Sequence, residues 1–225
     1  MSNVGCRIVD KINRSGSSLI NEFKGLPVAN VGDAMNRLAA LDPSIEPMND
    51  SKMIGLAFTV KVPEGDNLMF HKAMDMAKEG DVILIDAGGD TSRAILGELM
   101  AIYCQSRGIK GIVVDGAVRD KDVLKNLEIP VYAKAVSPNG PYKNGPGEIN
   151  IPISIGGRVV NPGDIVIGDG DGIITIDPKT AASILEKVKK IQETEANVLK
   201  EINEKGTYTR KWVDKKLNEI SCEYI

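Results

Sequence analysis

Aromatic side chains and histidine are scarce in this sequence. Its 225 residues include one tryptophan, three phenylalanines, five tyrosines and a single histidine, His71. The net charge is −3 and the basic residues form no block, so the chain lacks both the electrostatic footprint and the stacking platform of a nucleic-acid-binding domain. A lone histidine cannot build a zinc site, and we expect His71 to be an ordinary core or surface residue. Nucleic acid is not an expected partner.

Cysteines and long apolar segments are also few. The three cysteines lie far apart, at positions 6, 104 and 222, which fits neither a disulfide framework nor a CxxC metal site. No apolar run approaches the length of a membrane span, and the first residues carry no apolar signal-peptide segment. We therefore expect a cytoplasmic protein with no membrane partner.

The remaining composition is that of an ordinary globular protein. Hydrophobic residues make up 42% of the chain and charged residues 26%, and a chain of this length can bury one substantial core. Short apolar runs alternate with helical patterns, which is typical of parallel βαβ units. The predicted strands span 54–62, 82–85, 112–115 and 131–136, and the predicted helices span 16–41, 67–78, a segment that ends near 108, and 121–127.

The pattern changes after residue 136. Residues 137–172 are rich in proline and glycine, and closely spaced strands in such a context favour hairpins over helical crossovers. Short β-like pieces lie at 151–155, 158–160, 164–167 and 173–176. The segment 168–172 has neither the lysine of a P-loop nor the ligand spacing of an EF-hand, so we predict a turn there. The sheet should therefore be mixed.

A long charged helix is predicted between Pro178, which suits a first helical turn, and Gly206, which suits a helix end. Its stripe, with a 4-3-4-3-4 spacing, consists of Ile184, Val188, Ile191, Glu195, Val198 and Ile202. Such a stripe packs along a groove or a partner subunit. Glu195 is the exception, because a carboxylate on an apolar stripe is costly unless it is paired. Either its carboxylate reaches solvent, or the helix delivers it to a site across an interface.

A potential site follows the predicted strand 112–115. Residues 111–120 read Gly-Ile-Val-Val-Asp-Gly-Ala-Val-Arg-Asp, so Arg119 and Asp120 come where the chain should turn. Ligands of open α/β sheets bind at the carboxyl ends of parallel strands. A guanidinium is a fork for a carboxylate, and an aspartate is a hard oxygen ligand for a divalent cation. The pair indicates a site for a metal and a small anionic carbonyl compound, unless it is a loop ion pair or a helix cap.

Gly97 is a natural place for a helix to start. The backbone N–H groups of Glu98, Leu99 and Met100 would then form an anion site at the helix N-terminus. Glu98 would lie in the first turn, either beside a bound ligand or because the helix dipole alone favours an acid there. A right-handed crossover returns the chain beside its starting strand, so Glu98 and Arg119 should border the same crevice.

The spacing of these residues resembles a known signature. Glu98-x20-Arg119-Asp120 is similar to the Asp-x20-Arg-Asp signature of the class II pyruvate aldolases that cleave 4-hydroxy-4-methyl-2-oxoglutarate and 4-carboxy-4-hydroxy-2-oxoadipate. Further similar segments are Gly80-Asp81-Val82, Gly88-Gly89-Asp90, Gly97-Glu98-Leu99, Gly108-x2-Gly111, Val114-Asp115-Gly116-x2-Arg119-Asp120 and Pro130-Val131. The same core resembles the regulator of ribonuclease activity A, a non-catalytic relative. The similarity extends over residues 25–205.

The resemblance implies an architecture and an assembly. The fold would be an α/β fold, a swivelling β/α/β domain with a mixed sheet and a long C-terminal helix. Residues 1–177 would form the α/β core with N-terminal helices, and residues 178–225 a helical extension of the same domain that packs on a neighbouring subunit. The expected partner is a second copy, as a homotrimer or homohexamer with active sites between subunits, and the expected cofactor is Mg²⁺ or Mn²⁺.

The resemblance also implies roles for individual residues. The aspartate after the arginine binds the metal in these aldolases, a role that falls on Asp120, and the arginine that binds the pyruvyl group corresponds to Arg119. Glu98 takes the place of an acid that holds metal-bound water, and it is one methylene longer than the usual aspartate. Glu195 matches a glutamate supplied by the C-terminal helix of the neighbouring subunit.

The function implied is a metal-dependent lyase that cleaves a 4-hydroxy-2-oxo acid into pyruvate and a second carbonyl compound, with oxaloacetate decarboxylation as a side activity. A Schiff base on Lys110 or Lys121 is the metal-free alternative. A non-catalytic regulatory protein is the other alternative. The segment 137–150 is a candidate for reading the tail of the substrate, and Arg93 a candidate for contacting an anionic tail.

Overall fold

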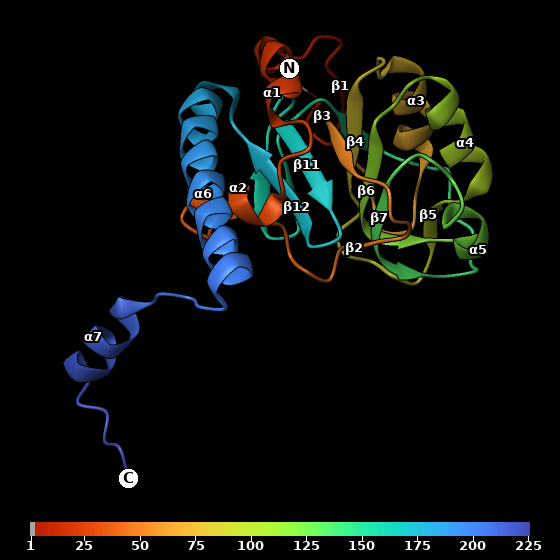
Figure 1. Ribbon diagram of the computed structural model, residues 1–225. Helices are drawn as coiled ribbons and strands as arrows, with labels where there is room; N and C mark the ends of the chain where they lie inside the picture. The colour runs from red at the N-terminus through yellow and green to blue at the C-terminus, as the bar shows by residue number, and fades with distance from the viewer. Residues whose placement is uncertain (1–2) are drawn as a thin grey trace.

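A ten-stranded mixed sheet forms the centre of the protein (Figure 1). The computed structural model describes residues 3–225. Four neighbouring parallel strands make up the middle of the sheet: β3 (Met53–Lys61), β4 (Asp81–Asp86), β6 (Gly111–Val118) and β7 (Val131–Val136). These strands confirm the four apolar runs, which are nearly continuous because both faces of a central parallel sheet are covered.

Strand β6 continues past the predicted end at residue 115 to Val118. Its pairing with β7 shifts in register between Val114 and Ala117, the signature of a β-bulge. Gly116 lies in this bulge, where a Cβ atom would come within 3.0 Å of the carbonyl oxygen of Asp90. The acid and the glycine therefore bend the strand without ending it. On the other side of β6, the short parallel strand β5 (Ala94–Leu96) pairs with the extension.

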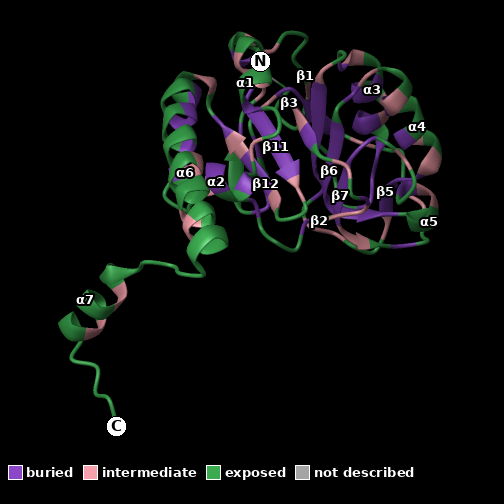
Figure 2. Cartoon of the chain, in the orientation of Figure 1, coloured by how far each residue is buried: buried purple, intermediate pink, exposed green. Residues whose placement is uncertain are grey.

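Helices α3 (Leu68–Met76), α4 (Glu98–Ser106) and α5 (Lys121–Leu124) cover one face of the sheet, on the right in Figure 1. Their inward side chains, among them Phe70 and Leu124, pack in one buried cluster with residues of the central strands. Figure 2 shows these strands as the buried part of the molecule, between exposed helix surfaces. This face places the amino end of α4 and the amino end of α5 next to the carboxyl end of β6.

Two hairpins cover or extend the opposite side. The β9–β10 hairpin (Ile153–Ile155 and Arg158–Val160) contributes to a second buried cluster with β4 and β7. The β11–β12 hairpin (Ile165–Asp169 and Gly172–Ile176) continues the sheet antiparallel to β3. Both hairpins, and the turn within 168–172, confirm the interpretation of the proline- and glycine-rich half.

The N-terminal helical prediction, 16–41, is only partly right. The structure has three short pieces there, the 3-10 turn η1 (Ser15–Leu19), α1 (Ile20–Phe23) and α2 (Val28–Ala34). Gly25 adopts a left-handed φ of 84°, which ends the first pieces, and Pro27 precedes the first residue of α2. A proline disfavours the helical conformation in the residue before it, so the helical pattern cannot continue through this point.

The apolar pattern of the sequence does not predict three short strands. Strand β8 (Gly147–Ile149) pairs with β3 and, in parallel, with β1 (Cys6–Ile8) at the edge of the sheet. Strand β2 (Glu46–Pro47) pairs with β7 at the other edge. Each has only two or three residues, too few for an alternation to be recognised.

The predicted C-terminal helix is present as α6 (Pro178–Lys205). Asp177 caps it by accepting a hydrogen bond from the Lys179 N–H (2.9 Å), and Gly206 ends it with a left-handed φ of 64°. The helix packs through Ile184 and Val188 against α2 and the β11–β12 hairpin. A further helix, α7 (Lys211–Glu219), has no buried residue and lies apart from the body in Figure 1. None of the helices in residues 3–225 is both long and apolar enough to cross a bilayer.

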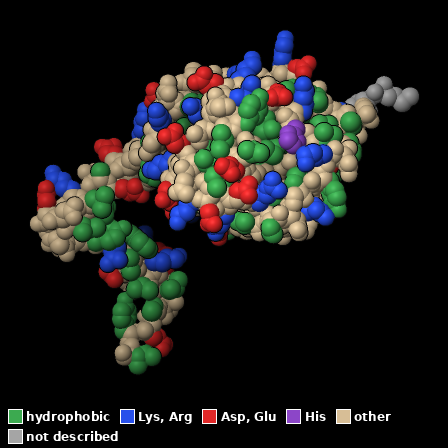
Figure 3. Space-filling model, turned by 90° about the vertical axis from the view of Figure 1, so that its right-hand side faces the viewer, with side chains coloured by type: hydrophobic (Ala, Val, Ile, Leu, Met, Phe, Trp, Pro, Cys, Tyr) green, Lys and Arg blue, Asp and Glu red, His purple; other side chains and the backbone are tan. Residues whose placement is uncertain are grey.

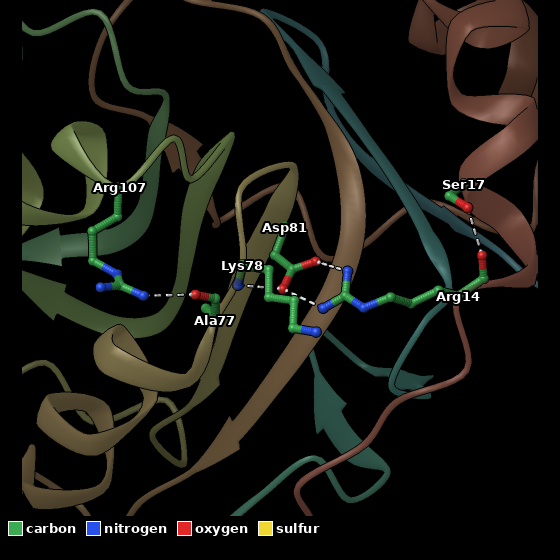
Figure 4. A network of polar contacts seen from close by, with 6 residues as sticks. All are labelled: Arg14, Ser17, Ala77, Lys78, Asp81 and Arg107. Carbon is green, nitrogen blue, oxygen red and sulfur yellow. Dashed lines mark hydrogen bonds and ion pairs between the residues drawn. The ribbon is translucent and has the colours of Figure 1, made fainter.

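An ion pair between half-buried Arg14 and buried Asp81 fastens the N-terminal segment to the sheet (Figure 4). Arg14 donates from both terminal nitrogens to the two carboxylate oxygens of Asp81, at 2.7 and 2.9 Å. Asp81 is fully buried at the start of β4, and it also accepts a hydrogen bond from the Lys78 N–H (2.8 Å). These bonds to Asp81 raise the pKa of the Arg14 guanidinium above its ordinary value. The pair therefore anchors the first helices against the strand that begins there.

Candidate active site

The main chain fixes Arg119 and Asp120 just beyond the end of β6. The Arg119 N–H donates to the Leu96 carbonyl of β5 (2.9 Å). Asp120 has a left-handed backbone, with φ of 59° and ψ of 39°, and its carbonyl accepts hydrogen bonds from Val123 and Leu124 at the start of α5 (3.0 Å each). Non-glycine residues adopt this conformation rarely, and it is concentrated at functional positions. Both side chains are thereby directed out of the sheet.

The side chains of Arg119 and Asp120, which together with Glu98 we call the corner, contact the first turn of α4. Asp120 Oδ2 accepts a hydrogen bond from the Glu98 N–H (3.0 Å) and lies 3.6 Å from Arg119 Nε. The structure thus brings Glu98, Arg119 and Asp120 together, as the crossover argument predicts. Arg119 and Asp120 keep 46% and 39% of their side chains exposed. This ion pair also matches the simpler reading of a loop salt bridge, so the pairing by itself assigns no role.

Gly97 leaves the space in which this corner forms. It precedes Glu98 at the start of α4, and its carbonyl accepts the first helical hydrogen bond, from Ala101 (3.1 Å). A Cβ atom at this position would overlap Asp120 Oδ2 and come within 2.8 Å of Arg119 Cγ. The backbone of Gly97 is extended, with φ of −147°, so the requirement for glycine is one of space.

A cavity of about 520 Å³ opens beside the corner. The candidate residues Gly97, Glu98, Leu99, Met100, Arg119 and Asp120 all line it, together with Asn67, His71, Ala94, Ile95, Leu96, Pro141 and Lys143. Figure 3 shows the side of the molecule that carries it, where the single histidine lies among hydrophobic and charged side chains. Leu99 is 80% exposed at the rim. The anion site predicted at the N-terminus of α4 has one amide fewer than expected. The Glu98 N–H already donates to Asp120 and is therefore engaged within the chain.

Two polar cavity residues, His71 and Asn67, were not predicted as site residues, and Lys143 was predicted only as part of the 137–150 segment. His71 is half-buried on α3, and partial burial together with the nearby charge of Lys143 lowers the pKa of its imidazole, against an opposing effect of Asp75. Lys143 comes from the loop before β8 and adds a positive charge to the cavity lining. Asn67 follows β3. The only available signal is that these loops leave the carboxyl side of the sheet, where ligands bind.

Asn67 is buried beside the cavity with one oxygen unused. Its side-chain amide donates to the Ile95 carbonyl (2.9 Å) and lies 3.6 Å from Met100 Sδ. Its Oδ1 atom has no hydrogen-bond partner in residues 3–225. Because buried polar atoms are nearly always satisfied, this oxygen is an acceptor available to a ligand or a water in the cavity.

Glu195 lies in a different part of the chain. It projects from the exposed second half of α6, and its Oε2 atom accepts a hydrogen bond from the buried side chain of Asn30 in α2 (2.7 Å). In Figure 1, α6 and α2 lie on the left of the sheet, and α4 and α5 lie on the right. Within one chain, then, Glu195 is remote from Arg119. Its delivery to the site of a neighbouring subunit stays a prediction.

The donor atoms of the corner fit a hydrated divalent ion. The described residues contain no group of three His, Cys, Asp or Glu side chains placed to hold a metal. Mg²⁺, however, keeps several waters and is often held through only one or two carboxylates. Asp120 offers a partly exposed carboxylate at the cavity wall, and Glu98 offers a second one in the adjacent turn. A hydrated Mg²⁺ or Mn²⁺ ion is therefore compatible with this chain's donors.

Comparison with known proteins agrees with the fold. The sequence matches the RraA-like family, described as Aldolase/RraA, over residues 28–175. A protein of Halalkalibacterium halodurans with the provisional name 4-hydroxy-4-methyl-2-oxoglutarate aldolase is 38% identical over 200 residues, which cover 88% of this chain and 95% of that protein.

Two solved structures share the architecture. An uncharacterized protein from Pseudomonas syringae superposes with a TM-score of 0.76 and 25% identity, over 85% of this chain and 95% of that one. The RNA-processing inhibitor RraA from Thermus thermophilis superposes with a TM-score of 0.62 and 28% identity, over 67% and 92%. The class is thus a mixed α/β protein with a cavity at the carboxyl end of its parallel strands. The chain belongs to the RraA-like family, which includes aldolases and RraA proteins.

Proposed function

We propose that the protein is a divalent-metal-dependent aldolase that cleaves a 4-hydroxy-2-oxo acid into pyruvate and a second carbonyl compound, and that it also decarboxylates oxaloacetate. One observation carries the proposal: Arg119, Asp120 and the first turn of α4 form one wall of an open cavity of about 520 Å³. A rigid guanidinium, a hard carboxylate and a helix N-terminus suit a small dianionic oxo acid.

The chain's own residues account for substrate binding. The Arg119 guanidinium can hold the pyruvyl oxygens as a planar fork. The N-terminus of α4, at Leu99 and Met100, favours the carboxylate of the substrate through the helix dipole. When bound at Asp120, Mg²⁺ or Mn²⁺ would supply a Lewis acid for the charge that develops on the 2-oxo group.

Bond cleavage then requires a proton acceptor and a stabilised enolate. Glu98 is in the cavity wall and takes the proton of the C4 hydroxyl through a water molecule. The C3–C4 electron pair moves into the pyruvate enolate, whose negative charge Arg119 stabilises. Protonation at C3 releases pyruvate. Glu195 from a second copy of the chain would complete the set of acids.

The Schiff-base alternative has less support. Lys110 precedes β6 at its amino end, opposite the corner, and Lys121 does not line the cavity. Lys143 does line it but is exposed. A nucleophilic lysine needs burial or a neighbouring cation to lower its pKa, and none of these three lysines is buried.

A regulatory role is the second candidate, because the structure resembles an RNA-processing inhibitor. A purely regulatory protein would not need the catalytic acids or the extra C-terminal helix. This chain has Arg119, Asp120 and Glu98 at one corner and carries Glu195 on α6, outside the matched family region. These features favour the enzyme.

Pyruvate release provides the test. Oxaloacetate and 4-hydroxy-4-methyl-2-oxoglutarate are supplied with Mg²⁺, with Mn²⁺ and with a chelator. Turnover should require the metal, and Arg119→Ala and Asp120→Ala should each lower it by about 100-fold or more, as for loss of one electrostatic stabiliser. Absence of metal-dependent turnover, with both variants behaving like wild type, would favour the regulatory protein.

A further inference from the structure

The loop between β7 and β8, residues 137–146, forms one wall of the cavity. Its residues Pro141 and Lys143 are part of the lining. Gly140 lies against the catalytic corner, since a Cβ atom built on it would come within 3.5 Å of Arg119 Nη1. The position of this loop therefore decides both the width of the cavity and the space left for the Arg119 guanidinium.

One arginine holds the tip of the loop. Arg93, just before β5, donates from Nη1 to the Gly140 carbonyl (3.0 Å) and from Nη2 to the Tyr142 hydroxyl (2.9 Å). Its guanidinium carbon also lies 4.2 Å from the centre of the Tyr142 ring, a cation–π distance. We call these three residues the clasp. Contact of Arg93 with an anionic substrate tail stays a prediction, because its guanidinium is already engaged with the loop in this structure.

The side chain of Arg93 packs directly against the backbone of Gly65. A Cβ atom on Gly65 would come within 2.9 Å of Arg93 Cδ, so the aliphatic part of Arg93 lies directly on this glycine. The Gly65 carbonyl accepts a hydrogen bond from the Tyr142 N–H (2.8 Å). The Asn67 N–H in turn donates to the Tyr142 carbonyl (3.0 Å), so two backbone hydrogen bonds join these chain segments and Arg93 adds side-chain contacts to both of them.

The ends of the loop are held by other groups. The Ala94 N–H donates to the Asn139 carbonyl (2.9 Å). On the other side, the buried carboxylate of Asp66 accepts hydrogen bonds from the Asn144 and Gly145 N–H groups, at 2.6 and 3.0 Å. Between these ends, Arg93 bonds the Gly140 carbonyl and the Tyr142 side chain, whereas the backbone of Tyr142 is bonded to Gly65 and Asn67.

We propose that Arg93 is a positioning residue for the cavity: through the clasp it holds the 137–146 loop against Arg119 and so sets the fit of the substrate tail. This inference rests on the proposed function, in that the cavity binds a 2-oxo acid. Arg93 reaches the reacting atoms only through Gly140 and Tyr142. Its loss should therefore affect binding of long substrates more than the bond-breaking step.

Arg93→Ala and Arg93→Lys test the proposal, with Arg107→Ala as the matched control. Arg107 also lies over a tyrosine ring, that of Tyr103, at 5.8 Å and donates to two backbone carbonyls, but it does not line the cavity. Hydrogen exchange of the Tyr142 amide is measured first, because it needs no substrate. Exchange should rise about tenfold or more in Arg93→Ala, less in Arg93→Lys, and not in Arg107→Ala.

Kinetics provide the second readout. For 4-carboxy-4-hydroxy-2-oxoadipate, KM should rise about tenfold in Arg93→Ala with kcat changed by less than about twofold, and KM for the shorter oxaloacetate should change less. Raised exchange with both KM values unchanged would show that Arg93 only stabilises the loop and would overturn the positioning role. If hydrogen exchange of the Tyr142 amide is unchanged in Arg93→Ala, Arg93 does not hold the loop, and the proposal is overturned at any level of turnover. A wild type without metal-dependent turnover would overturn the proposed function, while raised exchange in Arg93→Ala would still support the clasp.

Discussion

Gly97 shows, at the residue scale, how a missing side chain can define a site. Strand β5 ends and α4 begins at this residue, and the space beside its Cα is taken by Asp120 Oδ2 and the stem of Arg119. Both side chains are partly exposed, so they can move away from an added methyl group at little cost to folding. A methyl group added at Gly97 should therefore displace Arg119 and Asp120 while it lowers the stability of the fold only slightly.

Gly97→Ala is expected to lower kcat/KM for oxaloacetate by about tenfold to 100-fold, since a misplacement near 1 Å has effects of this size. The melting temperature should fall by only a few degrees. Gly170→Ala is the control, because an added Cβ there meets nothing within 4 Å. Equal activity of the two variants would contradict a role for the corner in turnover.

The site residues divide into those that the sequence reveals and those that it does not. Glu98 and Arg119 belong to one strand–helix–strand unit, so a local rule about crossovers is enough to bring them together. Asn67 and His71 lie at the start of α3 and within it, Lys143 lies in the 137–146 loop, and only the packing of these two segments places them in the cavity. Arg93 engages acceptors on Gly140 and Tyr142 that are 47 and 49 residues away, so its neighbours in the sequence do not reveal them.

Helix α6 combines two environments at the scale of a single element. Ile184, Leu185 and Val188 are buried against α2 and the sheet, whereas Leu199, farther along, is 58% exposed. The sequence predicts an apolar stripe interrupted at Glu195, and in the structure only its first part, up to Val188, is buried. What it cannot reveal is where the chain's own core ends, because a partner's surface and a chain's own core require the same residues.

Two alanine variants separate these environments. Val188→Ala removes a fully buried side chain and should lower the free energy of unfolding by about 2 kcal/mol at every protein concentration. Leu199→Ala should have no effect in dilute solution and should lower the melting temperature only where subunits associate. Chemical denaturation measures the first effect and thermal unfolding the second, each over a range of protein concentrations. A loss for Leu199→Ala that does not depend on concentration would place this residue in the core of its own chain.

The other elements show why short pieces are hard to predict. Strands 54–62, 82–85 and 131–136 were found because buried parallel strands are apolar on both faces. Strand β8 was missed because its three residues pair with β1 and β3, far away in the sequence. The apolar spacing of residues 16–41 predicts a longer N-terminal helix than the structure has, because Gly25 and Pro27 interrupt it.

The whole molecule raises the question of how Glu195 could act with Asp120. Helices α6 and α4 lie on opposite sides of the sheet (Figure 1), so one copy cannot bring these carboxylates together. Two copies arranged about a symmetry axis could do so, with each supplying a different part of the same site. The division of the chain at residue 177, with an extension that packs on a neighbour, remains a proposal on the same grounds.

Mixing two inactive variants tests this arrangement. Asp120→Ala and Glu195→Ala, each prepared alone, should show little turnover, whereas subunits exchanged at equal amounts should regain about a quarter of wild-type activity, because one site in four then combines two intact partners. A mixture of Asp120→Ala with Arg119→Ala should stay inactive, since both changes affect the same side of the site. No recovery in the first mixture, with exchange verified by mass, would argue against a shared site.

The packing of α2 on α6 has a consequence for synthesis of the protein. Phe23, Val28 and Val31 share one buried cluster with Ile184 and Val188, and Arg14 is the link from this segment to β4. During translation the early apolar residues leave the ribosome long before their partners are made, because domains emerge N-terminal end first. The nascent chain must therefore keep these side chains shielded, by a chaperone or by temporary contacts, until its last large helix has been completed.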